Sequence, residues 1–274
     1  MSELSELSEL SEGQNLQLGV ISGVIEAVIL QPTLYWKNAK AQQMPFTLDP
    51  RTIYRGTGVA VLAECSMMGL QFLFTAVTKK HLQKEGGGGG GGGGDFMAAA
   101  LGGGAAALFA SPLELVMIQQ QRFGGSLAGT VSSVVRQQGL LGGGMMRGLT
   151  AAACRDSIYV AGMLGLTPTL QRHLEQQQVP TAEASLYASL VGGVVAALPS
   201  HPFDCAKTCM QGDLQQAKYK SFSKTVAAIW AEGGIRRLFS GCMWRTINIT
   251  ATVYIANECR NRLSPLLLEG SFPF

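Results

Sequence analysis

A six-residue frame that recurs three times constrains the fold of this chain more than any other feature. Its clearest copy, Pro202-Phe203-Asp204-Cys205-Ala206-Lys207, puts an acid and a base three residues apart, and therefore on one face of a helix. The proline removes a backbone donor and is expected to kink that helix. The other copies begin at Pro32 and Pro112, so the three prolines lie 80 and 90 residues apart. This spacing predicts three repeats of one structural unit.

A second marker supports the same division of the chain. Gly56, Gly148 and Gly241 lie 92 and 93 residues apart, each before a long apolar stretch. We expect six spans of about the 20 or more residues that a bilayer requires, with short helices between them. The spans are 16–41, 57–81, 95–122, 149–174, 181–211 and 239–263, and the short helices are 126–138 and 221–232. The predicted fold class is all-α membrane: a six-transmembrane-helix bundle with threefold pseudo-symmetry.

Composition indicates a membrane protein with a polar interior. Hydrophobic residues make up 47% of the chain and charged residues only 14%, against about 25% charged in soluble domains. The mean hydropathy of +0.20 is low for a bundle that faces lipid on all sides, which favours polar side chains turned inward toward water. A net charge of +3, with no basic run interleaved with aromatics, argues against a nucleic-acid partner.

The sequence shows no pattern typical of an enzyme, a metal site or a bound cofactor. No nucleophile–base pair is evident, and the six cysteines form no CxxC pair and no Cys/His ligand spacing. Cys205 and Cys209 share a helical face, and we interpret them as small packing residues in preference to a redox pair. The glycine run 86–94 is not followed by Gly-Lys-Ser/Thr, which argues against a phosphate-binding loop.

The expected boundaries follow from the repeats and from the composition between them. We expect a mobile tail at 1–14, repeats at 15–84, 96–178 and 179–266, a glycine-rich linker at 85–95 and a second tail at 267–274. The chain opens acidic, with no basic region before an apolar one, so we expect no cleavable targeting segment and an internal address.

Three units in this register, covering about residues 16–263, resemble the mitochondrial carrier family. The resemblance implies six helices around a central cavity in the inner mitochondrial membrane, with the short helices on the matrix side. It also implies alternating access, in which the cavity opens first to one side and then to the other. We expect the partners to be a small metabolite and membrane lipid, cardiolipin included, and the chain to be a monomer unless it docks to a larger complex.

The resemblance further implies a matrix gate made of ion pairs between the odd-numbered helices. Carried onto this chain, Glu114 would meet Lys207 and Asp204 would meet Lys37, whereas the third pair is the apolar Leu34 and Met117. Replacing both charges of a buried pair is near neutral in energy, so this pattern is compensated. Gln121 and Gln211 match the family's glutamine braces beneath the gate, and Ala41 does not. The opposite gate is poorly matched, with only Glu258 in place near the sixth helix end.

By the same resemblance, substrate contacts lie seven residues after each glycine marker. These positions are Ala63 with Glu64 beside it, Arg155 with Asp156 beside it, and Asn248. A guanidinium can bind a carboxylate through two hydrogen bonds, and an aspartate can accept from an ammonium group, so this pattern resembles carriers of amino acids. Glu64 adds to the case for a positively charged group. The alternative is that Arg155 and Asp156 only pair with neighbouring helices.

Two further charges within the spans have open roles. Glu26 either lines the cavity or relieves a packing defect. Arg245 stands where the family often has a structural arginine, so we favour a structural role for it.

Together these features predict an exchanger of a small amino acid or related carboxylate, and not an enzyme. One alternative is an exchanger of di- or tricarboxylates. The other is a non-transporting subunit or adaptor of an inner-membrane complex, which the missing charges at Leu34 and Met117 would explain.

Overall fold

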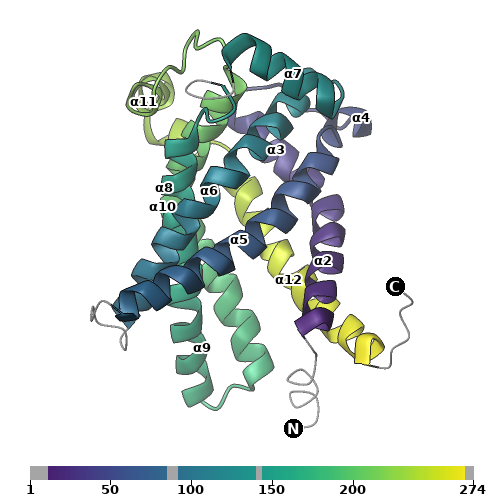
Figure 1. The fold of residues 1–274 in the computed structure, drawn as a ribbon, viewed down its shortest axis with the longest axis vertical. Helices are drawn as coiled ribbons and strands as arrows, with labels where there is room; N and C mark the ends of the chain where they lie inside the picture. The colour runs from purple at the N-terminus through teal and green to yellow at the C-terminus, as the bar shows by residue number, and fades with distance from the viewer. Residues whose placement is uncertain (1–11, 85–91, 140–143, 269–274) are drawn as a thin grey trace.

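The computed structural model describes residues 12–84, 92–139 and 144–268, and helices make up most of that part of the chain, with no strand in it. Figure 1 shows long helices that run between a group of short helices and the end where α2 begins and α12 ends. The elements are α2 (Glu12–Ile29), α3 (Gln31–Ala41), α4 (Pro50–Ile53), α5 (Thr57–Lys84), α6 (Gly92–Phe123), α7 (Leu127–Gln138), α8 (Leu149–Ala161), the π-helical η1 (Gly162–Leu166), α9 (Thr167–Gln176), α10 (Thr181–Gly212), α11 (Phe222–Leu238) and α12 (Cys242–Leu268).

The long helices form a closed ring in chain order. The segment α2–α3 packs on α5, α5 on α6, α6 on α8, the segment α8–η1–α9 on α10, and α10 on α12. The ring closes because α12 packs on both α2 and α3, with Leu18 against Leu263 near the chain ends. An all-helical fold is thus confirmed. By length and composition alone, two helices of the described chain could cross a bilayer, Met97–Phe123 and Thr181–Gly212.

Glycines allow the close approach of neighbouring helices in this ring. A Cβ on Gly103 of α6 would lie 2.7 Å from the Asp156 carbonyl oxygen of α8. A Cβ on Gly162 would lie 2.5 Å from the Ala196 Cβ of α10, and one on Gly193 would lie 2.9 Å from Ile249 of α12. Small residues at such contacts are typical of membrane helices, whose association depends on packing.

The three proline positions differ in their effect on the helices. The first expected span is broken at Leu30, between α2 and α3, and Pro32 lies in the first turn of α3. The hydroxyl of Thr33 donates to the Leu30 carbonyl at 2.7 Å, which satisfies a carbonyl at the break. By contrast, α6 continues through Pro112 and α10 through Pro202. The expected kink is therefore a helix break only in the first unit.

Several element ends differ from the sequence-based expectation. The Asp49-Pro50 pair starts the short helix α4, because the Asp49 carboxylate caps it by accepting from the Arg51 N–H. In α11 the helical conformation stops after Glu232, as expected, because the dihedral angles at Gly233 and Gly234 are non-helical, and a further helical segment then runs to Leu238. Helix α6 begins at Gly92, inside the segment expected to be a linker, and α2 and α12 extend into the expected tails. The rest of the linker and tails (85–91, 1–11 and 269–274) lies outside the described residues.

The three marker glycines occupy equivalent places in the ring. Gly56, Gly148 and Gly241 all have positive φ, at 80°, 81° and 90°, just before α5, α8 and α12. A Cβ on each would lie within 3.5 Å of the residue at the base position of the next unit, which is Met117, Lys207 and Lys37 respectively. The glycine before each of α5, α8 and α12 thus lies against the residue of α6, α10 or α3 that stands at the base position of the repeated frame.

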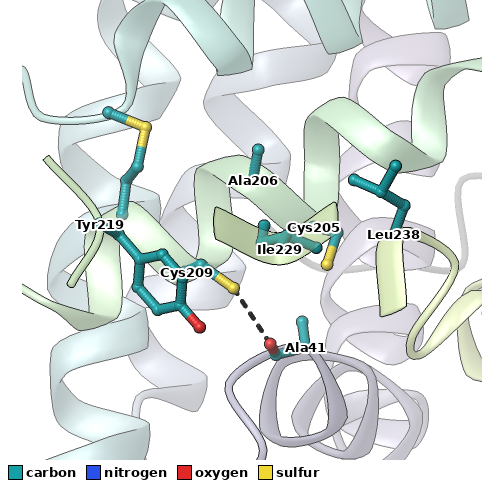
Figure 2. Packing of buried hydrophobic residues seen from close by; sticks show 8 residues of the cluster. Ala41, Cys205, Ala206, Cys209, Tyr219, Ile229 and Leu238 are labelled. Atoms are coloured by element: carbon teal, nitrogen blue, oxygen red, sulfur yellow. Dashed lines mark hydrogen bonds between the residues drawn. The ribbon is translucent and has the colours of Figure 1, made fainter. Parts of the chain in front are cut away.

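A buried cluster joins α10 to α11 and α3 at the end that carries α4, α7 and α11, hereafter the short-helix end. Cys205 and Cys209 are fully buried there with Ile229, and Figure 2 shows the Cys209 thiol donating to the Ala41 carbonyl of α3, at 3.1 Å. Both thiols are free, and the Arg237 guanidinium lies 3.7 and 3.6 Å from the two sulfurs. The pair therefore serves packing in this structure.

Candidate functional site

A cavity of about 200 Å³ lies inside the ring and is lined by all the long helices. All five positions predicted to contact substrate line it, and so do five of the six gate positions. The lining consists of Glu26, Leu34, Lys37, Ala60, Ala63, Glu64, Met67, Glu114, Met117, Arg155, Asp156, Tyr159, Asp204, Arg245, Asn248, Ile249 and Thr252. Tyr159 and Thr252 were not singled out from the sequence, although Tyr159 lies four residues after Arg155 and so on the same helical face.

The two ion pairs expected between the first, third and fifth spans are present, and these spans correspond to α3, α6 and α10 in the structure. Lys37 Nζ of α3 lies 3.0 Å from Asp204 Oδ2 of α10, and Lys207 Nζ of α10 lies 3.0 Å from Glu114 Oε1 of α6. All four side chains are largely buried. These pairs join the helices on one side of the cavity, and their role as a gate stays a prediction.

The third gate position is apolar, as the sequence requires. Leu34 packs against a buried cluster that contains Met117, Val116 and Val59. The contact replaces a charge pair by hydrophobic packing between α3, α5 and α6, so no charge is stranded there.

Arg155 extends the ion-pair network, which agrees with the alternative that it pairs with neighbouring helices. Its Nε and Nη2 donate to both Asp156 oxygens at 2.7 and 2.9 Å. Its Nη1 lies 2.7 Å from Glu114 Oε1 and 3.2 Å from Asp204 Oδ1. Every nitrogen of this guanidinium is thus bound to a carboxylate, and both acids of the two ion pairs are linked through it. With Asp156 it brings the buried network to three acids and three bases.

Amide side chains form hydrogen bonds between α3, α6 and α10 next to the ion pairs. Asn38 Nδ2 of α3 donates to Gln121 Oε1 of α6 at 2.8 Å. Gln211 Nε2 of α10 donates to the Ser111 carbonyl and hydroxyl of α6 at 3.2 and 3.1 Å. The bond from the Cys209 thiol to the Ala41 carbonyl closes the third side, between α10 and α3. Each pair among α3, α6 and α10 is therefore joined by at least one hydrogen bond at this depth.

The other candidate residues around the cavity differ in their hydrogen bonds and in their exposure. Asn248 Nδ2 donates to Thr33 Oγ1 at 2.8 Å, and Ala63 is buried. The Glu26 carboxylate accepts from Thr252 at 2.6 Å. Glu64 is exposed to the cavity and forms no hydrogen bond or ion pair with the described residues. Glu26 therefore lines the cavity, which was one of its two open readings.

Arg245 is buried beside the cavity. Its Nη2 donates to Ser200 Oγ at 2.9 Å, and its guanidinium carbon lies 5.7 Å from the centre of the Tyr159 ring. Its Nη1 is buried without a hydrogen-bond partner in the described chain.

Outside the spans, Asp213 organises the turn that follows α10. Its carboxylate accepts from the backbone N–H groups of Ala217, Lys218 and Tyr219. Partial burial would raise the pKa of Asp213, but these backbone hydrogen bonds outweigh it and hold the pKa below its usual range. At the opposite end of the bundle, Glu258 pairs with Arg262 of its own helix, and within the described ranges it has no ion pair with another helix. Among the described residues no group of three His, Cys, Asp or Glu side chains is arranged to hold a metal ion.

The comparison with known proteins decides the family. The model of the family described as mitochondrial carrier protein matches residues 92–178 and 179–260, more than half of the chain. The chain belongs to the mitochondrial carrier family. Its members are multi-pass proteins of the inner mitochondrial membrane, and the chain is assigned to that membrane accordingly.

Individual members of the mitochondrial carrier family match a shorter part of the chain. A mitochondrial glycine transporter of Laccaria bicolor is 32% identical over 126 residues, which are 44% of this chain and 39% of the relative. A mitochondrial 2-oxodicarboxylate carrier of Bos taurus is 29% identical over 115 residues, 40% of this chain and 38% of the relative. The solute carrier family 25 protein Shawn of Drosophila melanogaster is 31% identical over 148 residues, 48% of this chain and 37% of the relative. The match thus spans about two fifths of each relative.

Proposed function

We propose that this chain exchanges a small amino acid or a related carboxylate across the inner mitochondrial membrane by alternating access. The observation that carries the proposal is the cavity inside the ring. Its lining contains acidic and basic side chains, and each long helix contributes at least one of them. Ionisable side chains inside membrane helices are costly and mark substrate pathways. The cavity volume of about 200 Å³ is below the roughly 300–1,000 Å³ of pockets for drug-sized ligands, which favours a small solute.

The signs of the charges support an amino acid over an acid without an amino group. The cavity lining holds five carboxylates and three cations, and Glu64 among the carboxylates has no cation paired with it. A dicarboxylate would bring further negative charge to this surface, whereas a zwitterion brings none. The glycine transporter among the relatives transports, by its name, a solute of this kind.

A carboxylate without an amino group is the second candidate, because 2-oxodicarboxylate carriers of several mammals are among the relatives. In that reading the cations Arg155 and Arg245 carry recognition and the acids orient them. The adaptor reading has no support beyond the apolar pair Leu34 and Met117, which packs without a stranded charge.

The ion pairs account for how binding could drive the conformational change. Lys37–Asp204 and Lys207–Glu114 join the helices on one side of the cavity, and an opening on that side would require separating them. A ligand shifts such an equilibrium only by its difference in affinity for the two states. We propose that the carrier works as a monomer in contact with membrane lipid, cardiolipin included.

The test is a thermal-shift screen of the purified chain in detergent, followed by exchange in liposomes. Glycine, alanine, glutamate, 2-oxoglutarate, succinate and citrate form the panel. A solute that binds the folded state raises the melting temperature by mass action, and we expect the amino acids to do so. The same solutes should then exchange against internal substrate in liposomes, and a panel with no stabilising solute would contradict the proposal. Native mass spectrometry of the purified chain, after the bound detergent is removed, tests whether the carrier is a monomer.

A further inference from the structure

Arg155, the obvious partner for a substrate carboxylate, is already occupied. Its nitrogens bind Asp156, Glu114 and Asp204, and its side chain is 7% exposed. A substrate carboxylate that bound here would have to displace protein carboxylates that are closer and already aligned. In this conformation Arg155 belongs to the ion-pair network and not to the ligand.

Arg245 is a cation of the cavity lining whose guanidinium keeps an unpaired donor within the described chain. It is 8% exposed, so it is shielded from water and its charge acts strongly on anything that enters. Ser200 and the Tyr159 ring fix its orientation, while its Nη1 has no hydrogen-bond partner in the described chain. Asp204 lines the same cavity, but its oxygens are bound by Lys37 and Arg155. A buried donor without a partner carries an energetic penalty that an anionic ligand would remove.

A carboxyl group without an ion pair in the described chain lies on another helix, α5. Glu64 of α5 lines the cavity and forms no ion pair or hydrogen bond within the part of the chain that the structure describes. Glu114 lines the same cavity, and its Oε2 is buried without a partner. These carboxylate oxygens can accept from an ammonium group, which carries three donors and no acceptor.

We propose that Arg245 and Glu64 recognise the substrate as a dipolar α-amino acid, with Arg245 on the carboxylate and Glu64 on the ammonium group. The inference rests on the proposed transport function and names the substrate class and the residues that select it. Arg155 acts on the substrate only through the ion-pair network. The substrate thus bridges α12 and α5, two helices that the ion pairs do not join.

The test compares one amino acid with its two halves on the purified full chain. Alanine carries both groups, propionate keeps the carboxylate and ethylamine keeps the amino group. The readouts are the shift in melting temperature and the competition of each solute with alanine uptake into liposomes. For the wild type we expect alanine to bind about tenfold or more tightly than either half, because both charged contacts contribute.

Two substitutions separate the two ends of the ligand. Glu64→Gln should lower the affinity for alanine to about that for propionate, while binding of propionate itself is retained or improved. Arg245→Gln should abolish the response to propionate, and Arg245→Lys should restore part of it because the charge remains. Exposed residues of the same types, Glu183→Gln and Arg236→Gln, are the matched controls and should leave both readouts unchanged.

The outcomes distinguish this inference from the transport function beneath it. Uptake of alanine by the wild type with unchanged discrimination in both Glu64→Gln and Arg245→Gln would overturn the inference and leave the transport function standing. A wild type that binds propionate or 2-oxoglutarate better than alanine would also overturn it. A wild type that binds and exchanges none of the solutes would remove the proposed function and the inference together. If Arg245→Gln is too unstable to purify, the Arg245→Lys and Glu64→Gln results decide.

Discussion

Six buried charges meet between α3, α6, α8 and α10, three acids and three bases in mutual contact. Each of the bases Lys37, Lys207 and Arg155 touches Asp204, and two of them also touch Glu114. Such a network is stable only while it is complete, because a buried charge without its partner keeps the cost of desolvation and loses the attraction. The network therefore behaves as a unit.

Removal of Arg155 should destabilise the folded chain as well as stop exchange. In Arg155→Ala, the carboxylates of Asp156, Glu114 and Asp204 lose a shared cation, and we expect a loss of roughly 3–5 kcal/mol of stability. Thermal unfolding in detergent measures this loss. Arg172→Ala, which removes an exposed arginine of α9 that bonds only its own helix, is the control and should change the melting temperature little. Equal melting temperatures for both variants would contradict the network.

The partners in this network were only partly predictable. The resemblance to the carrier family implied the pairs Lys37–Asp204 and Glu114–Lys207, and the structure contains both. The contacts of Arg155 with Glu114 and Asp204 depend on how far a long side chain reaches between helices, which no spacing within one helix specifies. The same holds for the free Nη1 of Arg245, whose role from sequence was only structural.

Among the helical elements, the start of each second long helix is tightly constrained, because a glycine with positive φ precedes it. Gly241 has φ of 90°, and a Cβ there would lie 2.8 Å from the Lys37 carbonyl oxygen. An L-residue in this left-handed conformation costs about 1–2 kcal/mol even without the contact. The beginning of α12 is therefore fixed against the turn of α3 that carries an ion-pair lysine.

Gly241→Ala should lower the melting temperature, by the left-handed strain and by the clash with the Lys37 backbone. We expect a loss of at least about 1–2 kcal/mol. Gly58→Ala provides the opposite case, because Gly58 lies in α5 with nothing within 4 Å of its added Cβ. There alanine should stabilise by about 0.5–1 kcal/mol, since glycine is a poor helix former. The two thermal unfolding curves should shift in opposite directions, and a shift of Gly241→Ala to higher temperature would refute the proposed constraint.

The helices themselves were largely predictable, and their interruptions were not. The apolar stretches and marker glycines indicated every long helix within a few residues. The same Pro-x-x pattern, however, gives a break near Pro32 and a continuous helix at Pro112 and Pro202. The first copy has Gln31, whose side chain donates to the Ile53 and Arg55 carbonyls of another segment, so tertiary contacts accompany the break.

The assembled ring predicts which internal groups become accessible during exchange. Cys209 is fully buried and bonds to Ala41 across the contact between α10 and α3, next to the Lys37–Asp204 ion pair. If the proposed exchange opens the ring on that side, these helices separate and the thiol becomes exposed to water.

Alkylation of Cys209 by a maleimide should therefore be faster while the carrier exchanges substrate than while it rests. The measurement uses a variant in which the other five cysteines are replaced, reconstituted in liposomes and sampled by mass spectrometry. We expect at least a severalfold increase in rate with a substrate on both sides of the membrane, and none in a Cys209→Ala control. An unchanged labelling rate during measured exchange would show that α10 and α3 stay together.

The ring closes on itself through α12 against α2, with Leu18 on Leu263, just as it is joined elsewhere by consecutive helices. Packing therefore does not distinguish the junction between α12 and α2 from the junctions between consecutive helices. A gene opened between α5 and α6, with α12 linked directly to α2, would encode the same set of neighbours. The neighbours of each helix in the folded ring therefore do not depend on which of the three units is synthesised first.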